Sequence, residues 1–261
     1  MHNVPESVHL GNNFLFFHKA DKIWARILPM LKVFNQHELP SALEYLDVEA
    51  VNITNETFPI QTKEIIDSVY VYEKAQQLGQ EQAKTKEAKF SYLRAWPIEN
   101  ESGYLLYHLA KIIKPQLILE GGTSFGVSTL FLAQALQENG IGKVVTVEVS
   151  KLKHVQAEEN FKRAKLAGYI QQEKLALDQY LKSTDMIYDM IFLDCDRSRY
   201  PFYLTQLLPH LRNEALIIVD NALDRAQDIY QYQELIEKDR RFRSALVAIG
   251  DGLLLSRFLA V

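Results

Sequence analysis

Short apolar runs alternate with longer amphipathic segments through most of the second half of the chain. Each apolar run is short enough for a buried strand, and each amphipathic segment is long enough for a helix. This rhythm is typical of βαβ units and predicts a mainly parallel sheet with helices on both faces. The segments are, in order, QLILE (116–120), FGVSTLFLAQALQE (125–138), KVVTVEV (143–149), KHVQAEENFKRAKLAG (153–168), YDMIFLD (188–194) and ALIIVD (215–220).

The C-terminal stretch SALVAIGDGLLLSRFLAV (244–261) has a different pattern. Two apolar runs flank Gly-Asp-Gly, which favours a hairpin or short connection between two strands. We therefore expect an antiparallel strand at the end of the sheet.

The region before Pro97 lacks this alternation. Residues 62–94 are rich in Glu, Gln, Lys and Ala, which favour helix, but they include Gly79. The tract therefore predicts one long helix or two broken ones. The change of pattern divides the chain into a helical N-terminal extension, residues 1–95, and an α/β domain, residues 96–261.

Composition is that of an ordinary globular protein. The chain has 261 residues, 48% of them hydrophobic and 24% charged, with a single cysteine and a formal net charge of -4. The charge gives no overall basic surplus for nucleic acid or an anionic membrane, and one cysteine excludes an intrachain disulfide framework. Charged residues interrupt the apolar stretch 14–34, and the first residues lack a secretory signal pattern. We expect a cytoplasmic protein without a membrane span.

The stretch LILEGGTSFGVSTLFLA joins the first predicted strand to a helix. Gly122 and Gly126 would let the backbone approach a ligand closely and aim a helix N-terminus at it, although a structural turn without a ligand would look the same. The dinucleotide fingerprint is absent, because the glycine after Gly122 is four residues on. Glu148 ends the next strand, where an acid can hold a ribose diol or be a solvated charge. An adenosine-type ligand fits both features.

Acidic residues close two other apolar runs. Asp194 follows the run in IFLDCDRSRY (191–200), and Asp220 follows ALIIV. Ligands of α/β sheets bind beyond the carboxyl ends of the strands, so both acids lie where chemistry would take place. If these strands are parallel neighbours, the two carboxylates meet at one edge.

The motif E-x-G-x-x-x-G in EGGTSFG, followed by the acid in TVEV, resembles the class I S-adenosylmethionine-dependent methyltransferases. Further stretches resemble the cation-dependent O-methyltransferases of the catechol and caffeoyl-CoA type: PIENESGYLLYHLA, FLDCDRSRY, VDNAL and IGDGLLLSRF. The resemblance covers residues 96–258. It implies a Rossmann-like methyltransferase sheet, a small-molecule acceptor and a homodimer, with residues 1–90 matching only as a helical extension that is a candidate lid over the acceptor.

The resemblance also implies the residues of the site. A divalent cation, usually Mg²⁺, would be held by Asp194, Asp220 and Asn221, and hard oxygen ligands of this kind suit that ion. The alternative for Asp220 and Asn221 is capping of the following helix. The resemblance assigns to the cofactor Glu120, Gly122, Ser124, Gly126, Ser128, Glu148 and Asp194, with Trp96 and Ile98 as a wall near its methyl group and Ala176 near the adenine. Trp96 could equally be core packing.

Arg197 departs from the family pattern, which has a catalytic lysine three positions after the metal-binding acid. Arginine effectively cannot lose its proton and so cannot act as a general base. Three explanations remain open: a metal alone acidifies the hydroxyl, Arg197 anchors an anionic acceptor, or the protein binds the cofactor without transfer. A solvated arginine beside Asp196 is the simplest alternative.

Two functions follow from the sequence. The first is a metal-assisted O-methyltransferase in which Asp194 and Arg197 lie at the reacting atoms and a vicinal diol or hydroxy acid of secondary metabolism is methylated. The second is a non-catalytic nucleoside-binding protein, or an N-methyltransferase that needs no metal, on the same scaffold. Fold alone does not separate them.

Overall fold

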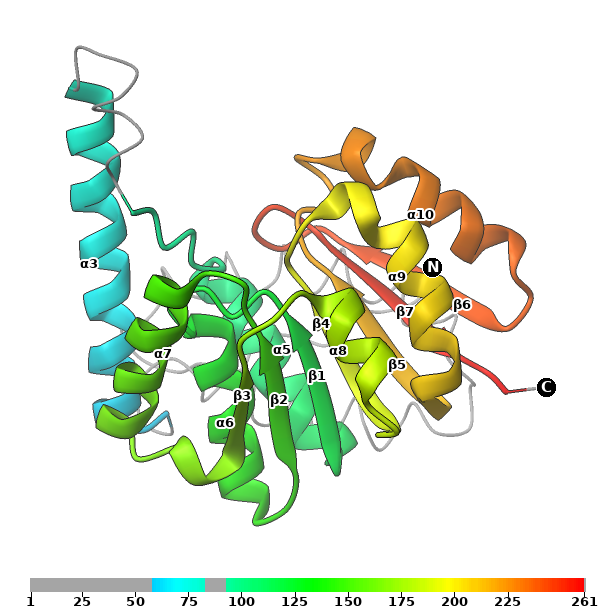
Figure 1. Cartoon of the computed structure of the whole chain (residues 1–261), viewed down its shortest axis with the longest axis horizontal. Coiled ribbons are helices and arrows are strands. Elements are labelled where there is room, and N and C mark those ends of the chain that lie inside the picture. The colour runs from blue at the N-terminus through cyan, green and yellow to red at the C-terminus, as the bar shows by residue number, and fades with distance from the viewer. Residues whose placement is uncertain (1–57, 83–92, 261) are drawn as a thin grey trace, which may run out of the picture.

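A computed structural model describes residues 58–82 and 93–260, and its centre is a seven-stranded sheet (Figure 1). The strand order is β3-β2-β1-β4-β5-β7-β6. The first five strands are parallel to one another, and β7 runs antiparallel to both β5 and β6. The predicted parallel sheet with an antiparallel last strand is confirmed. The strands are β1 (Leu117–Gly121), β2 (Lys143–Val147), β3 (Ile170–Glu173), β4 (Tyr188–Leu193), β5 (Leu211–Val219), β6 (Phe242–Val247) and β7 (Leu253–Phe258).

The C-terminal hairpin is inserted into the sheet in an order that the sequence did not show. The hairpin lies at one end of the sheet, as predicted, with β7 between β5 and the edge strand β6. The reason is burial: five of the six residues of β7 are buried, whereas only Phe242 and Val247, at the two ends of β6, are buried. The more apolar strand takes the inner position, where both neighbours cover its backbone.

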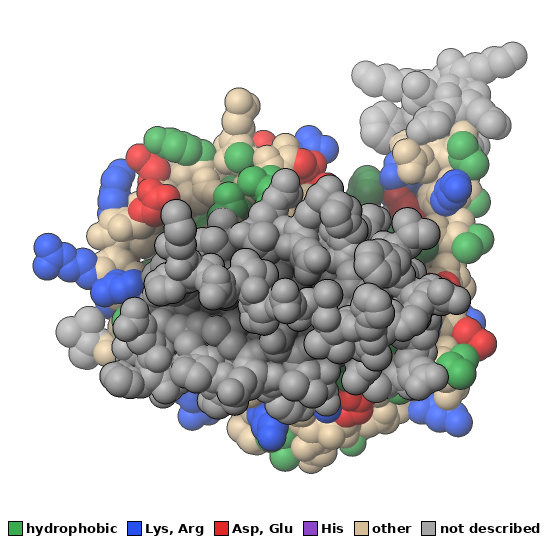
Figure 2. Space-filling model, turned by 180° about the vertical axis from the view of Figure 1, so that it is seen from behind, with side chains coloured by type: hydrophobic (Ala, Val, Ile, Leu, Met, Phe, Trp, Pro, Cys, Tyr) green, Lys and Arg blue, Asp and Glu red, His purple; other side chains and the backbone are tan. Residues whose placement is uncertain are grey.

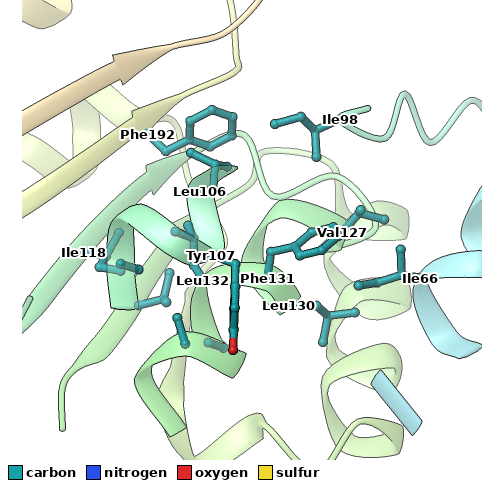
Figure 3. Packing of buried hydrophobic residues seen from close by; sticks show 14 of the residues in the cluster. Ile66, Ile98, Leu106, Tyr107, Ile118, Val127, Leu130, Phe131, Leu132 and Phe192 are labelled. Atoms are coloured by element: carbon teal, nitrogen blue, oxygen red, sulfur yellow. The ribbon is translucent and has the colours of Figure 1, made fainter. Parts of the chain in front are cut away.

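Helices cover both faces of the sheet, as predicted. They are α3 (Ile60–Gln82), α5 (Asn100–Ile113), α6 (Val127–Asn139), α7 (Lys151–Arg163), α8 (Leu177–Ser183), α9 (Tyr200–Leu207) and α10 (Ala226–Lys238). Successive strand residues point to opposite faces. Ile118 and Phe192 therefore pack into one core with α3, α5, α6 and α7 (Figure 3), while Leu119 and Ile191 pack into a second core with α8, α9 and α10.

The helix α3 stands at one side of the molecule next to α7 (Figure 1). Ile65, Ile66 and Val69 bury its inner face in the first core, and the Thr62 hydroxyl donates a hydrogen bond to Gln134 of α6 (2.9 Å). The helix prediction for 62–94 holds as far as Gln82, is wrong for residues 93 and 94, and lies outside the described residues from 83 to 92. The rest of the predicted extension, residues 1–57, also lies outside them.

The described surface carries both signs of charge. Lys and Arg side chains and Asp and Glu side chains both lie around the visible rim of the face in Figure 2, in keeping with the formal net charge of -4. Within residues 58–82 and 93–260, no helix is both long enough and apolar enough to cross a membrane.

Candidate active site

Three parallel strands end at the same edge of the sheet. The pattern of backbone hydrogen bonds continues just beyond them: the Asp194 amide donates to the Gly121 carbonyl (2.9 Å), and the Asp220 amide donates to the Leu193 carbonyl (3.1 Å). Since β4 lies between β1 and β5, the glycine-rich turn, Asp194 and Asp220 follow one another along this edge. The sequence prediction that the two acids meet at one edge is confirmed.

The glycine-rich turn after β1 fits tightly against the end of β4. Gly122 has a φ of 102°, and a Cβ atom there would overlap the carbonyl oxygen of Asp194. Gly126 has a φ of 83° and forms the N-cap of α6, and a Cβ atom there would overlap the ring of Phe161. Only glycine combines these backbone angles with so little space. The turn thus brings the start of α6 next to Asp194.

Glu120 lies beneath this turn and is fully buried. Its carboxylate accepts hydrogen bonds from the hydroxyls of Thr129 and Thr146, the latter at 2.6 Å. Burial raises the pKa of Glu120, while hydrogen bonds from Ser128, Thr129 and Thr146 oppose that rise. Glu120 therefore ties β1, β2 and the start of α6 together below the site.

Glu148 joins the turn to the end of β2. One carboxylate oxygen accepts the Ser124 amide (2.8 Å) and the other accepts the Ser150 amide (2.8 Å). The side chain is nearly buried, so the solvated-charge alternative is wrong. Each oxygen keeps a lone pair with which a hydroxyl pair of a ligand could bond.

A cavity lies between this turn and residues 95–98. Six of the predicted cofactor residues line it: Trp96, Ile98, Gly122, Ser124, Ser128 and Asp194. Of the remaining four, Glu120, Gly126 and Glu148 adjoin the glycine turn, whereas Ala176 is the N-cap of α8 and does not line the cavity. The volume of the cavity is about 10 Å³, which is enough for about one water molecule. Trp96 is exposed, so the core-packing alternative is wrong.

Residues 93–98, which we call the strap, form the outer wall of the cavity and are held by α3. Glu73 accepts hydrogen bonds from the Arg94 guanidinium (2.5 Å) and the Ala95 amide (2.6 Å). The hydroxyls of Tyr70 and Tyr72 donate to backbone carbonyls at 98 and 93, at 2.6 and 2.9 Å. The sequence analysis did not identify Tyr70, Tyr72 or Glu73 as site residues. The signal for them is that these aromatic and acidic residues lie close together in an otherwise polar helix.

The acidic edge of the site is strongly perturbed. Burial raises the pKa of Asp194 to about 6, despite the opposing charge of Arg197. Burial, and then the charge of Asp194, raise the pKa of Asp220 to about 7. Burial and the nearby Asp251 and Asp220 raise the pKa of Glu99 to about 7 as well. Four carboxyl groups therefore share a region that favours added positive charge.

Asn221 lies next to these acids with a φ of 59°. Its side-chain oxygen accepts a hydrogen bond from the Arg197 guanidinium (2.8 Å), and its amide nitrogen is 3.4 Å from a carboxylate oxygen of Asp251. The helix α10 begins at Ala226 without a side-chain cap, so the capping alternative for Asp220 and Asn221 is wrong.

Arg197 faces the site. Besides its bond to Asn221, its guanidinium lies 3.7 Å from the Asp228 carboxylate, and its side chain is 28% exposed. The alternative of a solvated arginine is therefore wrong. Within the described ranges no group of three His, Cys, Asp or Glu side chains is arranged to hold a metal ion. The candidate ligand set has two carboxylates, with an amide as its third member.

The sheet order, the glycine turn at the first strand and the acids after the second and fourth strands define the class of Rossmann-like methyltransferases, as the sequence indicated. Residues 67–259 match the model of a family described as O-methyltransferase. The chain belongs to this O-methyltransferase family, and its activity is S-adenosylmethionine-dependent methyl transfer.

Two individual relatives are also named as methyltransferases. A catechol O-methyltransferase of Niastella koreensis is 31% identical over 157 residues, which are 58% of this chain and 70% of the relative. A tapetum-specific methyltransferase of Arabidopsis thaliana is 25% identical over 76% of this chain and 93% of its own.

Solved structures share the fold. An O-methyltransferase from Bacillus cereus in complex with SAH is similar with a TM-score of 0.58 at 26% identity, over 73% of this chain and 99% of that one. The O-methyltransferase TomG from Streptomyces achromogenes, in complex with SAM, has a TM-score of 0.64 at 21% identity, over 83% and 96% of the two chains. A homodimer and a cytoplasmic location stay predictions for this chain.

Proposed function

We propose that the protein methylates a hydroxyl of a small molecule with two adjacent oxygens, such as a catechol-like diol, and that a divalent cation at Asp194, Asp220 and Asn221 assists. The observation that carries the proposal is the pair of acids at the ends of the neighbouring strands β4 and β5. Asp220 is buried, Asp194 is partly buried, and both have a raised pKa. Two carboxylates with little access to water at the ends of neighbouring strands are costly unless a cation neutralises them.

The donors at this edge fit a hard divalent cation. One carboxylate oxygen of Asp220 is buried without a hydrogen-bond partner among the described residues. The Asn221 oxygen has two lone pairs, of which Arg197 takes one. When bound, such a cation would orient two substrate oxygens and acidify the hydroxyl to be methylated, so that no lysine base is needed.

The cofactor would lie along the glycine turn. In this proposal Gly122, Ser124 and Ser128 surround its methionine end, Glu148 holds the ribose diol, and Ala176 lies near the adenine. Support comes from the cavity that the strap and the turn enclose, and from the free lone pairs of Glu148.

Arg197 has a positioning role in this scheme. Its hydrogen bond fixes the side-chain oxygen of Asn221, and its charge opposes the rise in the pKa of Asp194. Arginine remains charged throughout the reaction, so it neutralises the acids and does not take a proton.

The same hydrogen bond favours a second candidate function, methyl transfer without a metal. The guanidinium that lies on Asn221 would then be the cation that faces the acceptor. The acceptor would be an amine, or an oxygen that is already ionised.

Chelation separates the two candidates. The full-length protein is dialysed against EDTA, and turnover of catechol with S-adenosylmethionine is measured before and after Mg²⁺ is restored. The metal-assisted proposal expects turnover to fall at least about 100-fold and to recover, because the cation supplies several kcal/mol of stabilisation. Phenol, which lacks the adjacent hydroxyl, should be a poor acceptor.

Variants test the ligands directly. Asp220→Asn should weaken Mn²⁺ binding, followed by the paramagnetic resonance signal of the free ion. Asp185→Asn replaces an exposed aspartate elsewhere on the surface and is the matched control. Turnover that is indifferent to EDTA, with no Mn²⁺ bound by the parent protein, would refute the metal-assisted proposal and leave the second candidate.

A further inference from the structure

Trp96 is held in a strained conformation at the mouth of the cavity. Its φ is 41°, in the left-handed region that a bulky residue rarely adopts. Its side chain is 63% exposed, so burial of the indole does not explain the strain. Its neighbour Ala95 is fixed on both sides, since Glu73 accepts its amide and the Ser124 hydroxyl donates to its carbonyl. Strain of this kind persists where the surroundings impose it, and it gathers at ligand sites.

The indole ring of Trp96 already attracts cations. The Lys153 ammonium lies over the ring, 4.6 Å from its centroid, and the Arg94 guanidinium carbon is 5.9 Å from the centroid. Both distances are within the range of a cation–π interaction, and tryptophan is the strongest partner for it. The ring is therefore a binding surface for positive charge on the wall of the cofactor cavity.

The Lys153 ammonium can also interact with carboxylates near the ring. Lys153 lies in the first turn of α7. Its backbone amide donates a hydrogen bond to the side chain of Ser150, the N-cap of that helix. Burial lowers its pKa, whereas Glu148, Asp194 and Glu73 act electrostatically to raise it. A lysine is a flexible point charge, so its ammonium can leave the ring and turn toward one of these carboxylates.

We propose that the face of Trp96 that carries the Lys153 ammonium is the binding surface for the sulfonium of S-adenosylmethionine, and that the two cations exchange there in each turnover. This inference rests on the proposed function, because it needs the cofactor in this cavity. In a sulfonium, as in a quaternary ammonium, carbon groups surround the charged atom, and aromatic faces bind cations of this kind.

This exchange makes the site bind the cofactor more tightly than the product. During transfer the acceptor hydroxyl gives up its proton to solvent and a bond forms between its oxygen and the methyl carbon, while the bond from carbon to sulfur breaks with its electron pair staying on sulfur. The product, S-adenosylhomocysteine, is then a neutral thioether that the ring no longer attracts. The Lys153 ammonium can then return to the indole while the product is still bound, so the product gains no affinity from the ring.

Calorimetric titration of the full chain with both ligands tests this. We expect Trp96→Leu to weaken S-adenosylmethionine binding about 5- to 30-fold, the size of a partly desolvated cation–π interaction, and to change S-adenosylhomocysteine binding less than about twofold. Trp96→Phe should keep part of the preference. Lys153→Met removes the competing ammonium, so it should strengthen S-adenosylmethionine binding several-fold without affecting the product.

Controls separate this from general damage to the site. Tyr230→Leu removes an equally exposed aromatic ring on α10 that does not line the cavity, and it should change neither affinity. Sinefungin, which carries an ammonium in place of the methylsulfonium, should follow S-adenosylmethionine in every variant. The exchange would be overturned if Trp96→Leu weakened cofactor and product binding equally, or if neither Trp96→Leu nor Lys153→Met changed the ratio of the two affinities. Either result would leave the proposed cofactor site intact. A parent protein that binds neither ligand would overturn the site itself.

Discussion

The two hydrogen bonds that Glu73 accepts are the strongest link between α3 and the strap. Its carboxylate is nearly buried and is bonded to Arg94 at 2.5 Å and to the Ala95 amide at 2.6 Å. Glu73→Ala leaves both donors without this partner, and breaking a buried charged pair costs about 3–5 kcal/mol. Glu73→Gln keeps an oxygen for the amide and loses only the charge, so we expect about 1–2 kcal/mol.

Thermal and denaturant unfolding measure these values. At about 2–4 °C per kcal/mol for a chain of this size, Glu73→Ala should lower the Tm by about 6–20 °C. Because the strap carries Trp96, cofactor affinity in a titration should also fall at least about tenfold. Glu64 is exposed on the same helix, so Glu64→Ala is the matched control and should stay within about 0.5 kcal/mol of the parent.

Two outcomes would refute this reasoning. If Glu73→Ala unfolds like the Glu64 control, the hydrogen bonds do not hold the strap. If stability falls while cofactor affinity is unchanged, the strap is held by Glu73 but does not shape the cavity.

Two further predictions follow from the glycine turn and from His108, a partly buried histidine. Gly122→Ala should abolish cofactor binding in a titration, because its Cβ atom would overlap the Asp194 carbonyl; Gly140→Ala, at a φ of 70° with open space, should cost only about 1 kcal/mol in denaturant unfolding and leave binding intact. Burial lowers the pKa of His108 to about 4, so its contribution to stability is complete above about pH 6.5 and is lost as the pH falls toward 4. His108→Phe should therefore lose less Tm between pH 7 and pH 4.5 than the parent; an identical loss would mean that His108 is not linked to folding.

The local patterns of the sequence predicted the strands β1, β2, β4 and β5, the helices α6 and α7, and the glycine turn. Neighbouring residues such as Ile118 and Leu119 are both apolar, because β1 is covered on both faces, and this predicts a central parallel strand. Gly122 and Gly126 were identifiable because their roles depend on a local backbone turn. Asp194 and Asp220 were identifiable because each closes an apolar run.

Contacts between distant segments were not readable from those patterns. Position 93 lies 21 residues from Tyr72 in the chain, and the Ala95 amide lies 22 residues from Glu73, yet these bonds form the cavity wall. The order of β7 and β6 likewise depends on which strand is better buried against β5. Such pairings are set by packing free energy summed over the whole sheet, which has no signature in a short window of sequence.

What the sequence determined by itself is therefore the chemistry that is available: a glycine turn, acids at the ends of three strands, an amide beside one of them, and an arginine where the family resemblance leads us to expect lysine. Tertiary structure decided what these groups do to one another. Because Asp220 is buried and β4 and β5 are neighbours, burial and then the charge of Asp194 raise the pKa of Asp220, and because Arg197 turns inward, it bonds to Asn221. The physical reason is that residue type fixes charge and hydrogen-bonding capacity, whereas burial and distance, which set their strength, exist only in the folded chain.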